Sequence, residues 1–182
     1  MHLVEHWFGA GFAELHPLLQ QLHRQGGNLH GQVDLQLGKG LAGTLGARLA
    51  RRWGIAPDHP QVPLKVSIHS SGDTLHWNRY FADAAPMRSS FQPHGSWPDG
   101  YWIESTGGIR LALAVDVHNG GWYWRPLKAW VHGVRVPLWL LPRTEAYKRI
   151  EAERYHFHVG FSLPLLGLLF SYSGALQLEL QG

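Results

Sequence analysis

Residues 64–81, LKVSIHSSGDTLHWNRYF, decide the fold class of this chain. Apolar side chains occupy every second position from Leu64 to Ile68, and again at Leu75, Trp77 and Phe81, with Arg79 as the one exception on that face. A period of two is typical of a β-strand that buries one of its faces. A Ser-Ser-Gly-Asp segment separates the two halves and supplies turn-forming residues, so the stretch predicts a β-hairpin.

The strand pattern extends from this hairpin in both directions. On its N-terminal side, the segment 31–37 alternates Val33, Leu35 and Leu37 with polar residues. On its C-terminal side, further strands are predicted at 87–92, 101–106, 109–118, 122–131, 154–163 and 168–180. A His-Asn-Gly-Gly turn at 118–121 separates two of them. The chain therefore has about eight or nine mostly antiparallel strands, joined by short loops.

Two regions have the three-to-four spacing of amphipathic helices. In residues 3–24, Phe8, Phe12 and the following leucines form one apolar stripe, which Pro17 divides into two short helices by standing in the first turn of the second. A second helical region covers 41–53, before a proline-rich loop. We therefore expect short N-terminal helices that plug or cover a concave sheet.

These elements predict a single α+β domain over residues 1–182, helical at 3–24 and 41–53 and β-rich from 62 to 180. The length suits one domain, and no linker or internal repeat divides it. An antiparallel sheet of this many strands curves strongly. The expected fold is a strongly curved sheet or a partly closed β-barrel.

Composition excludes several classes of function. The chain has no cysteine, which rules out disulfides, thiolate metal sites and cysteine nucleophiles. The longest apolar stretch, Phe161 to Phe170, contains Pro164 and Gly167 and is about half the length of a membrane span, which needs about twenty residues. The N-terminus lacks the basic and apolar regions of a signal peptide. We therefore expect no membrane span and a cytoplasmic location.

Charge gives no support to nucleic-acid binding. The formal net charge is +3, and the basic residues are scattered along the chain. The one tight group, Arg48, Arg51 and Arg52, falls at the end of the predicted 41–53 helix, where cations favour the helix dipole. A nucleic-acid-binding domain concentrates its positive charge on one face.

A glycine motif resembles the phosphate-binding loop of dinucleotide folds. Gly38, Gly40 and Gly43 spell G-x-G-x-x-G between a strand and a helix. The preceding strand alternates polar and apolar residues, whereas the first strand of a parallel sheet is almost wholly apolar. No further strand–helix units follow. We interpret the motif as a strand-to-helix turn and predict no nucleotide cofactor.

Histidines form two strings that resemble zinc sites. His2 and His6 belong to an H-x-x-E-H string, but it starts at the second residue, where chain ends fray. His156 and His158 lie on one face of a predicted strand and could bind zinc only with a third ligand such as His132 or His118, so surface histidines are the preferred interpretation. We predict no metal site and no catalytic motif.

Arg79 is the residue that best indicates a site. It falls on the same strand face as Leu75, Trp77 and Phe81, and a buried charge on an apolar face needs a partner. Glu104, in the predicted strand 101–106, is the expected partner. The pair is either structural or holds an arginine in a pocket for a ligand carboxylate or phosphate.

Several motifs together resemble a bacterial family known only as a domain of unknown function, number four-one-six-six. They are Trp77-x-Arg79-x-Phe81, the segments 133–137, 142–145 and 157–159, and Ser162-Leu163-Pro164-Leu165-Leu166-Gly167 followed by Tyr172 and Gly174. The likeness runs from about Gly9 to Leu180. Members of that family occur alone or fused to saccharopine-dehydrogenase-like modules, so the resemblance implies an oxidoreductase partner but no activity of its own.

Prolines 137 and 142 bracket a short apolar segment, Leu138 to Leu141, that cannot belong to a central strand. It forms either a loop that covers the core or an exposed lip at the mouth of a cavity. Nine tryptophans in one chain similarly indicate either an aromatic core or an aromatic-lined cleft.

Three hypotheses of function follow. The first is a binding module for a hydrophobic or lipid-like small molecule in an aromatic-lined cavity. The second is an accessory domain that docks on an oxidoreductase through an exposed apolar patch at 137–142. The third is an enzyme without a recognised motif, with acid and base among Arg79, Glu104, Tyr172 and the histidines. The predicted ligand-binding residues are Trp77, Arg79, Trp102, Glu104, Trp130, Arg143 and Tyr172.

Overall fold

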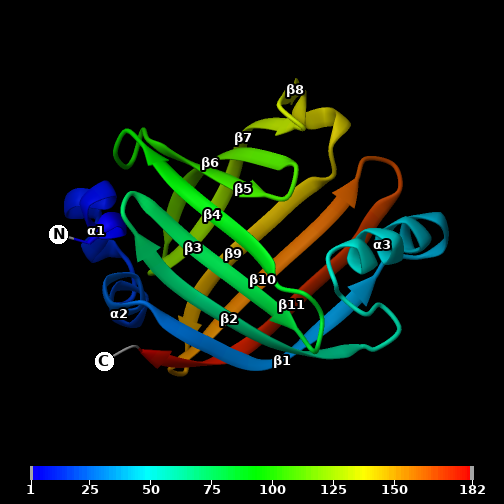
Figure 1. The fold of residues 1–182 in the computed structure, drawn as a ribbon, viewed down its shortest axis with the longest axis horizontal. Helices are drawn as coiled ribbons and strands as arrows, with labels where there is room; N and C mark the ends of the chain where they lie inside the picture. The colour runs from blue at the N-terminus through cyan, green and yellow to red at the C-terminus, as the bar shows by residue number, and fades with distance from the viewer. Residues whose placement is uncertain (1, 181–182) are drawn as a thin grey trace.

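The computed structural model describes residues 2–180, and within them ten antiparallel strands close into a β-barrel (Figure 1). The barrel strands are β1 (Gly27–Leu37), β2 (Gln61–Ser71), β3 (Thr74–Phe81), β4 (Met87–His94), β5 (Tyr101–Thr106), β6 (Ile109–His118), β7 (Gly121–Val131), β9 (Arg143–Glu151), β10 (Arg154–Leu163) and β11 (Gly167–Leu180). The ring closes because β7 pairs with β6 on one side and with β9 on the other. A short strand, β8 (Val134–Val136), pairs with the end of β7 outside the ring.

The sequence predicted eight or nine strands and a partly closed sheet. The structure corrects both predictions, because ten strands form a closed ring. The barrel strand that the sequence did not reveal is β9. Its inward positions include Thr144 and Lys148 beside Ala146, so the segment lacks the apolar alternation that marks a half-buried strand. Pairing of β9 with β10 and, over three residue pairs, with β7 closes the sheet.

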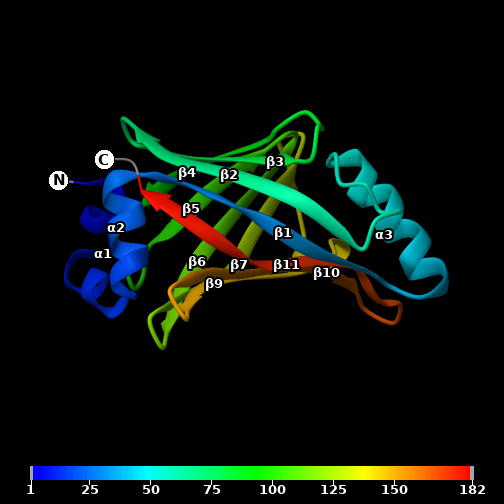
Figure 2. The same cartoon turned by 90° about the horizontal axis from the view of Figure 1, so that it is seen from below.

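The N-terminal helices close one end of the barrel, which we call the plug end (Figures 1 and 2). They are α1 (Leu3–Phe8), the 3₁₀-helix η1 (Gly9–Glu14) and α2 (Pro17–Gln25). Pro17 is the first residue of α2, as expected from its fixed φ. Backbone hydrogen bonds attach this region to the barrel loops, from His16 N to Gly120 O at 2.9 Å and from Trp97 N to Trp7 O at 2.9 Å.

The plug end is packed with aromatic rings. Trp102 and Trp122 are fully buried, and Trp7 and Phe8 of α1 pack on them with ring centroids 5.2 Å (Trp7–Trp102) and 5.0 Å (Phe8–Trp122) apart. Edge-to-face pairs of this kind add stability beyond the area they bury. The expected N-terminal plug therefore seals its end of the barrel with a tryptophan core.

The opposite end, which we call the mouth end, carries α3 (Gly40–Arg52) and the short 3₁₀-helix η2 (Leu138–Leu140). The backbone of α3 lies directly against β11, since a Cβ at Gly46 would overlap the carbonyl of Leu169. A Cβ at Gly38 would likewise overlap the carbonyl of Leu168, and one at Gly43 the carbonyl of Gly38. The G-x-G-x-x-G motif thus permits close helix–strand packing in an antiparallel barrel, where no βαβ unit exists.

No helix of residues 2–180 is long and apolar enough to cross a membrane.

A candidate binding cavity

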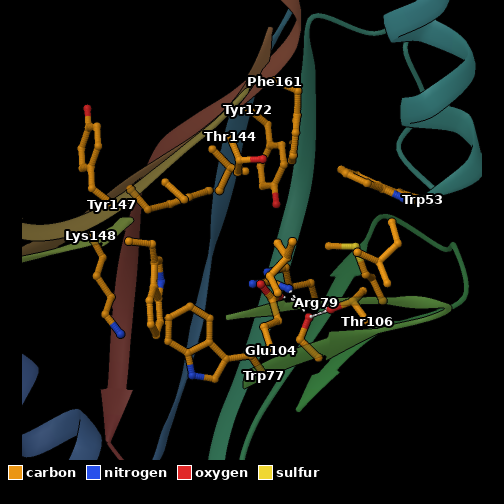
Figure 3. Close-up of a pocket in the computed structure, with 18 of the residues that line it drawn as sticks. Trp53, Trp77, Arg79, Glu104, Thr106, Thr144, Tyr147, Lys148, Phe161 and Tyr172 are labelled. Atoms are coloured by element: carbon orange, nitrogen blue, oxygen red, sulfur yellow. Dashed lines mark hydrogen bonds between the residues drawn. The ribbon is translucent and has the colours of Figure 1, made fainter. Parts of the chain in front are cut away.

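A cavity of about 540 Å³ lies inside the barrel (Figure 3). Its walls are mostly apolar and come from strands around the ring, with Leu49 contributed by α3 and Trp53 lying directly after this helix. Trp77, Phe91 and Trp124 form an aromatic wall toward the plug end, with Phe91 and Trp124 stacked at 5.5 Å. Ligand pockets of proteins usually have volumes of about 300–1,000 Å³ and predominantly apolar walls.

The cavity opens at the mouth end. Three of its lining residues, Ile109, Leu138 and Arg143, are exposed, and each lies at the end of the barrel that carries α3 and η2. Leu141 and Pro142 line the same opening. Of the two alternatives for residues 137–142, the structure therefore shows the lip of a cavity.

One group of polar side chains interrupts the apolar wall. Arg79 Nη1 donates to Ser89 Oγ at 2.9 Å, and Ser89 Oγ lies 2.6 Å from Thr106 Oγ1. The Thr106 hydroxyl donates to Glu104 Oε1 at 3.2 Å. Arg79 and Glu104 are thus connected through two hydroxyls, and among the ion pairs of residues 2–180 none joins them directly. We refer to Arg79, Ser89, Thr106 and Glu104 as the polar cluster.

Arg79 keeps most of its donors available to the cavity. A guanidinium has five N–H donors, and only Nη1 has a hydrogen-bond partner within the described chain. The ring of Trp77 lies 5.6 Å from its guanidinium carbon. The hydroxyl of Tyr172 points toward Arg79 and accepts no hydrogen bond from any described residue (Figure 3). Burial raises the pKa of Tyr172, and the charge of Arg79 partly opposes that rise.

A second polar pair lies at the plug-end side of the cavity, where Lys148 is itself one of the lining residues. Lys148 of β9 is buried, and its Nζ is 2.8 Å from Nε2 of His23 on α2. The rings of Trp77 and Trp122 lie 4.1 Å and 3.8 Å from that nitrogen. Burial, reinforced by the charge of Arg79, holds the pKa of Lys148 well below its ordinary value. Burial and the neighbouring lysine likewise lower the pKa of His23.

Five of the seven predicted ligand-binding residues line the cavity: Trp77, Arg79, Glu104, Arg143 and Tyr172. Trp102 lies instead in the core of the plug end, where it packs on Trp7 and Trp122. Trp130 of β7 is not among the lining residues, and Arg110 of β6 lies 5.7 Å from its ring. Alternation along a single strand gives the face of a residue but not its height along the barrel, so it could not separate Trp77 from Trp102.

Sequence reasoning missed Ser89, Thr106 and Lys148. Ser89 is buried in β4, on the same strand face as Phe91. The sequence shows this alternation, so Ser89 could have been proposed as a partner for Arg79. Lys148 gave no such signal, because a lysine in a segment without apolar alternation is normally exposed.

The histidine strings do not assemble a site. Within residues 2–180 no group of three or more histidine and carboxylate side chains could hold a metal ion. His158 stacks on Tyr147 at 5.6 Å, and His156 lies 3.7 Å from Glu151.

Ring closure, a plugged end and an internal cavity define a closed antiparallel β-barrel with a chamber inside it. The chain belongs to the family described as "Domain of unknown function (DUF4166)", whose model matches residues 15–176. That range includes every barrel strand up to the middle of β11. No curated protein matches the chain.

Proposed function

We propose that the barrel binds an apolar, lipid-like molecule with an anionic end, and that Arg79 holds this end inside the cavity. The observation that carries the proposal is an arginine with unused donors in a chamber whose walls are mostly apolar. Arg79 is half-buried, and a cation partly withdrawn from water loses hydration that Ser89 replaces only with a neutral oxygen. A ligand carboxylate would satisfy the guanidinium through two parallel hydrogen bonds.

The polar cluster also sets the orientation of such a ligand. Glu104 accepts from Thr106 and lines the same cavity, and its charge reaches Tyr172, where it adds to the rise of the tyrosine pKa. A ligand carboxylate would therefore have to approach Arg79 from the side away from Glu104. The tail then extends between Trp53, Phe161 and the lip toward the mouth. Arg143 lies at the opening, where it would meet a ligand that projects from the cavity.

The experiment compares two probes with the same tail, dodecanoate and dodecanol, by calorimetric titration of delipidated protein. We expect wild-type protein to bind dodecanoate, and Arg79→Met to weaken this binding about tenfold to a hundredfold, as for one lost charge-assisted contact. Dodecanol binding should change little in the same variant. Arg88→Met, which alters an exposed arginine on neighbouring β4, is the matched control.

Two results would overturn the proposal. One is the absence of binding by either probe, together with a native mass spectrum of freshly purified protein that shows no bound molecule. The other is equal dodecanoate affinity in Arg79→Met and wild type, with both proteins folded by circular dichroism.

The exposed lip favours a second candidate, an accessory domain that docks on an oxidoreductase. That hypothesis predicted an apolar patch at 137–142 in place of an enclosed cavity, and the patch exists beside a cavity. Retention of a purified saccharopine-dehydrogenase-like protein by wild type, but not by Trp139→Ser, would support it.

A further inference from the structure

The exposed apolar side chains gather at the mouth end. Trp139 is 74% exposed, and Leu140 beside it is also exposed on η2. Leu165 and Leu166 form the tip of the β10–β11 hairpin, with no contact that shields Leu165 from solvent. Leu41 is exposed in the first turn of α3. Large exposed apolar groups are a cost unless they meet a partner, so their clustering marks an interaction surface.

Strand connections explain why these residues share one end. In an antiparallel meander, alternate connections lie at the same end of the barrel. The β1–α3 junction, the lip before β9 and the β10–β11 hairpin are all connections at the mouth end (Figures 1 and 2). The register brings them close together, since Arg143 after the lip pairs with Ser162, and Gly38 contacts Leu168.

The charged residues are also distributed unequally between the two ends of the barrel. Exposed basic residues accompany the mouth end: Lys39, Arg48, Arg51, Arg52, Arg135 and Arg143. Acidic residues accompany the plug end: Glu5, Glu14, Asp99, Asp116, Glu151 and Glu153. Some charges of opposite sign lie at each end, since Asp58 pairs with Arg51 at the mouth, and Arg24, Arg125 and Arg149 pair with Glu5, Asp116 and Glu151 at the plug. Basic residues still outnumber acidic ones at the mouth, and acidic residues outnumber basic ones at the plug. A negatively charged surface would attract the mouth end and repel the plug end.

We propose that the mouth end docks on the surface of an anionic lipid membrane, with Trp139, Leu140, Leu165 and Leu166 inserted among the lipids and the basic residues above the headgroups. The apolar residues stand on separate protruding turns around an opening, which suits insertion into lipid better than contact with a flat protein surface. Tryptophan prefers the membrane interface, and leucines beside basic residues are typical of interfacial anchors. The cavity would then open directly onto the source of an apolar ligand.

This inference goes beyond the proposed ligand binding, because it is tested without any ligand. Delipidated protein is sedimented with vesicles of phosphatidylcholine alone and with vesicles of equal parts phosphatidylcholine and phosphatidylglycerol, at low and high salt. We expect binding to the mixed vesicles, weakened by salt, and little binding to the neutral ones. Brominated lipid should quench wild-type fluorescence more than that of Trp139→Phe at equal binding.

Variants locate the docking surface. Trp139→Ser/Leu140→Ser and Leu165→Ser/Leu166→Ser should each weaken binding at least tenfold. Lys39→Glu/Arg135→Glu should do so by more than tenfold, since each basic residue near an anionic surface contributes roughly fivefold. Leu180→Ser and Arg154→Glu, which change exposed residues at the plug end, should bind as wild type does. Arg79→Met should also bind vesicles normally, so failure of the cavity proposal would leave this result intact.

The proposal is overturned if neither vesicle binds, or if the mouth variants bind as tightly as the plug-end controls. It is also overturned if vesicles fail to bind while a purified protein partner binds wild type and not the mouth variants, because the surface would then be a protein interface.

Discussion

The two ends of this barrel use the same amino acid for opposite purposes. At the plug end, Trp102 and Trp122 are fully buried and pack on the rings of α1. At the mouth end, Trp139 projects into solvent, and Trp53, the residue after α3, lines an open chamber. Trp77 and Trp124 stand between them as the wall that divides packed core from cavity. The tryptophans of this chain therefore form both a core and a lined cleft, and height along the barrel axis decides which.

The largest expected effect breaks the packed end. Trp102→Ala removes a fully buried indole from the plug-end core and should lower the free energy of unfolding by about 3–5 kcal/mol. Trp139→Ala at the mouth should change it by less than about 0.5 kcal/mol. Urea denaturation followed by circular dichroism measures both. Should Trp102→Ala fail to fold, Trp102→Phe gives a smaller loss of the same sign. Similar values for Trp102→Ala and Trp139→Ala would contradict the division of the barrel into two ends.

A second effect concerns the attachment of α3 to the mouth. Gly46→Ala should destabilise the protein by about 2 kcal/mol, because the new Cβ overlaps the backbone carbonyl of Leu169, which cannot move cheaply. In a free helix the same change stabilises by up to about 1 kcal/mol, so the sign is diagnostic. Thr44→Ala, on the exposed face of α3, is the control and should be nearly neutral. A stabilised Gly46→Ala would show that α3 and β11 are not in backbone contact.

The smallest expected change in stability concerns Lys148, which lies at the boundary between the two ends. Lys148→Met should stabilise the protein by roughly 1 kcal/mol at pH 7, since it removes a buried amine that has no carboxylate partner, while His23 loses its contact. Lys65→Met, at an exposed position of β2, should have little effect. Thermal unfolding between pH 7 and pH 10 measures both variants.

The gain from Lys148→Met should shrink as pH rises. The pKa of Lys148 is lowered in the folded protein, so between that pKa and the ordinary value near 10.4 the unfolded chain binds more protons. Wild-type stability therefore rises with pH across this window and approaches that of the variant. A variant that is less stable than wild type at every pH would indicate instead a charged amine held by the Trp77 and Trp122 rings.

The sequence predicted most strands because one face of each is apolar, and it predicted the helices because their stripes are regular. It could not reveal β9, where Lys148 and Thr144 occupy inward positions, and without β9 the ring could not be counted or closed. Arg79 could be found because a charge interrupts an apolar face. Its partners could not, since Ser89 and Thr106 come from strands whose alignment depends on loop lengths and register.

Gly46 has a kinetic consequence for whatever enters the barrel. It brings the backbone of α3 against the Leu169 carbonyl of β11, so we expect that side of the mouth to move little without breaking the backbone contact. The opposite side, residues 137–142, is tied down by the three residue pairs of β8 and one 3₁₀ turn. We therefore expect the lip to be the moving part of the entrance. The rates of entry and exit would then depend on residues that do not contact a bound molecule, and could change without any change in its affinity.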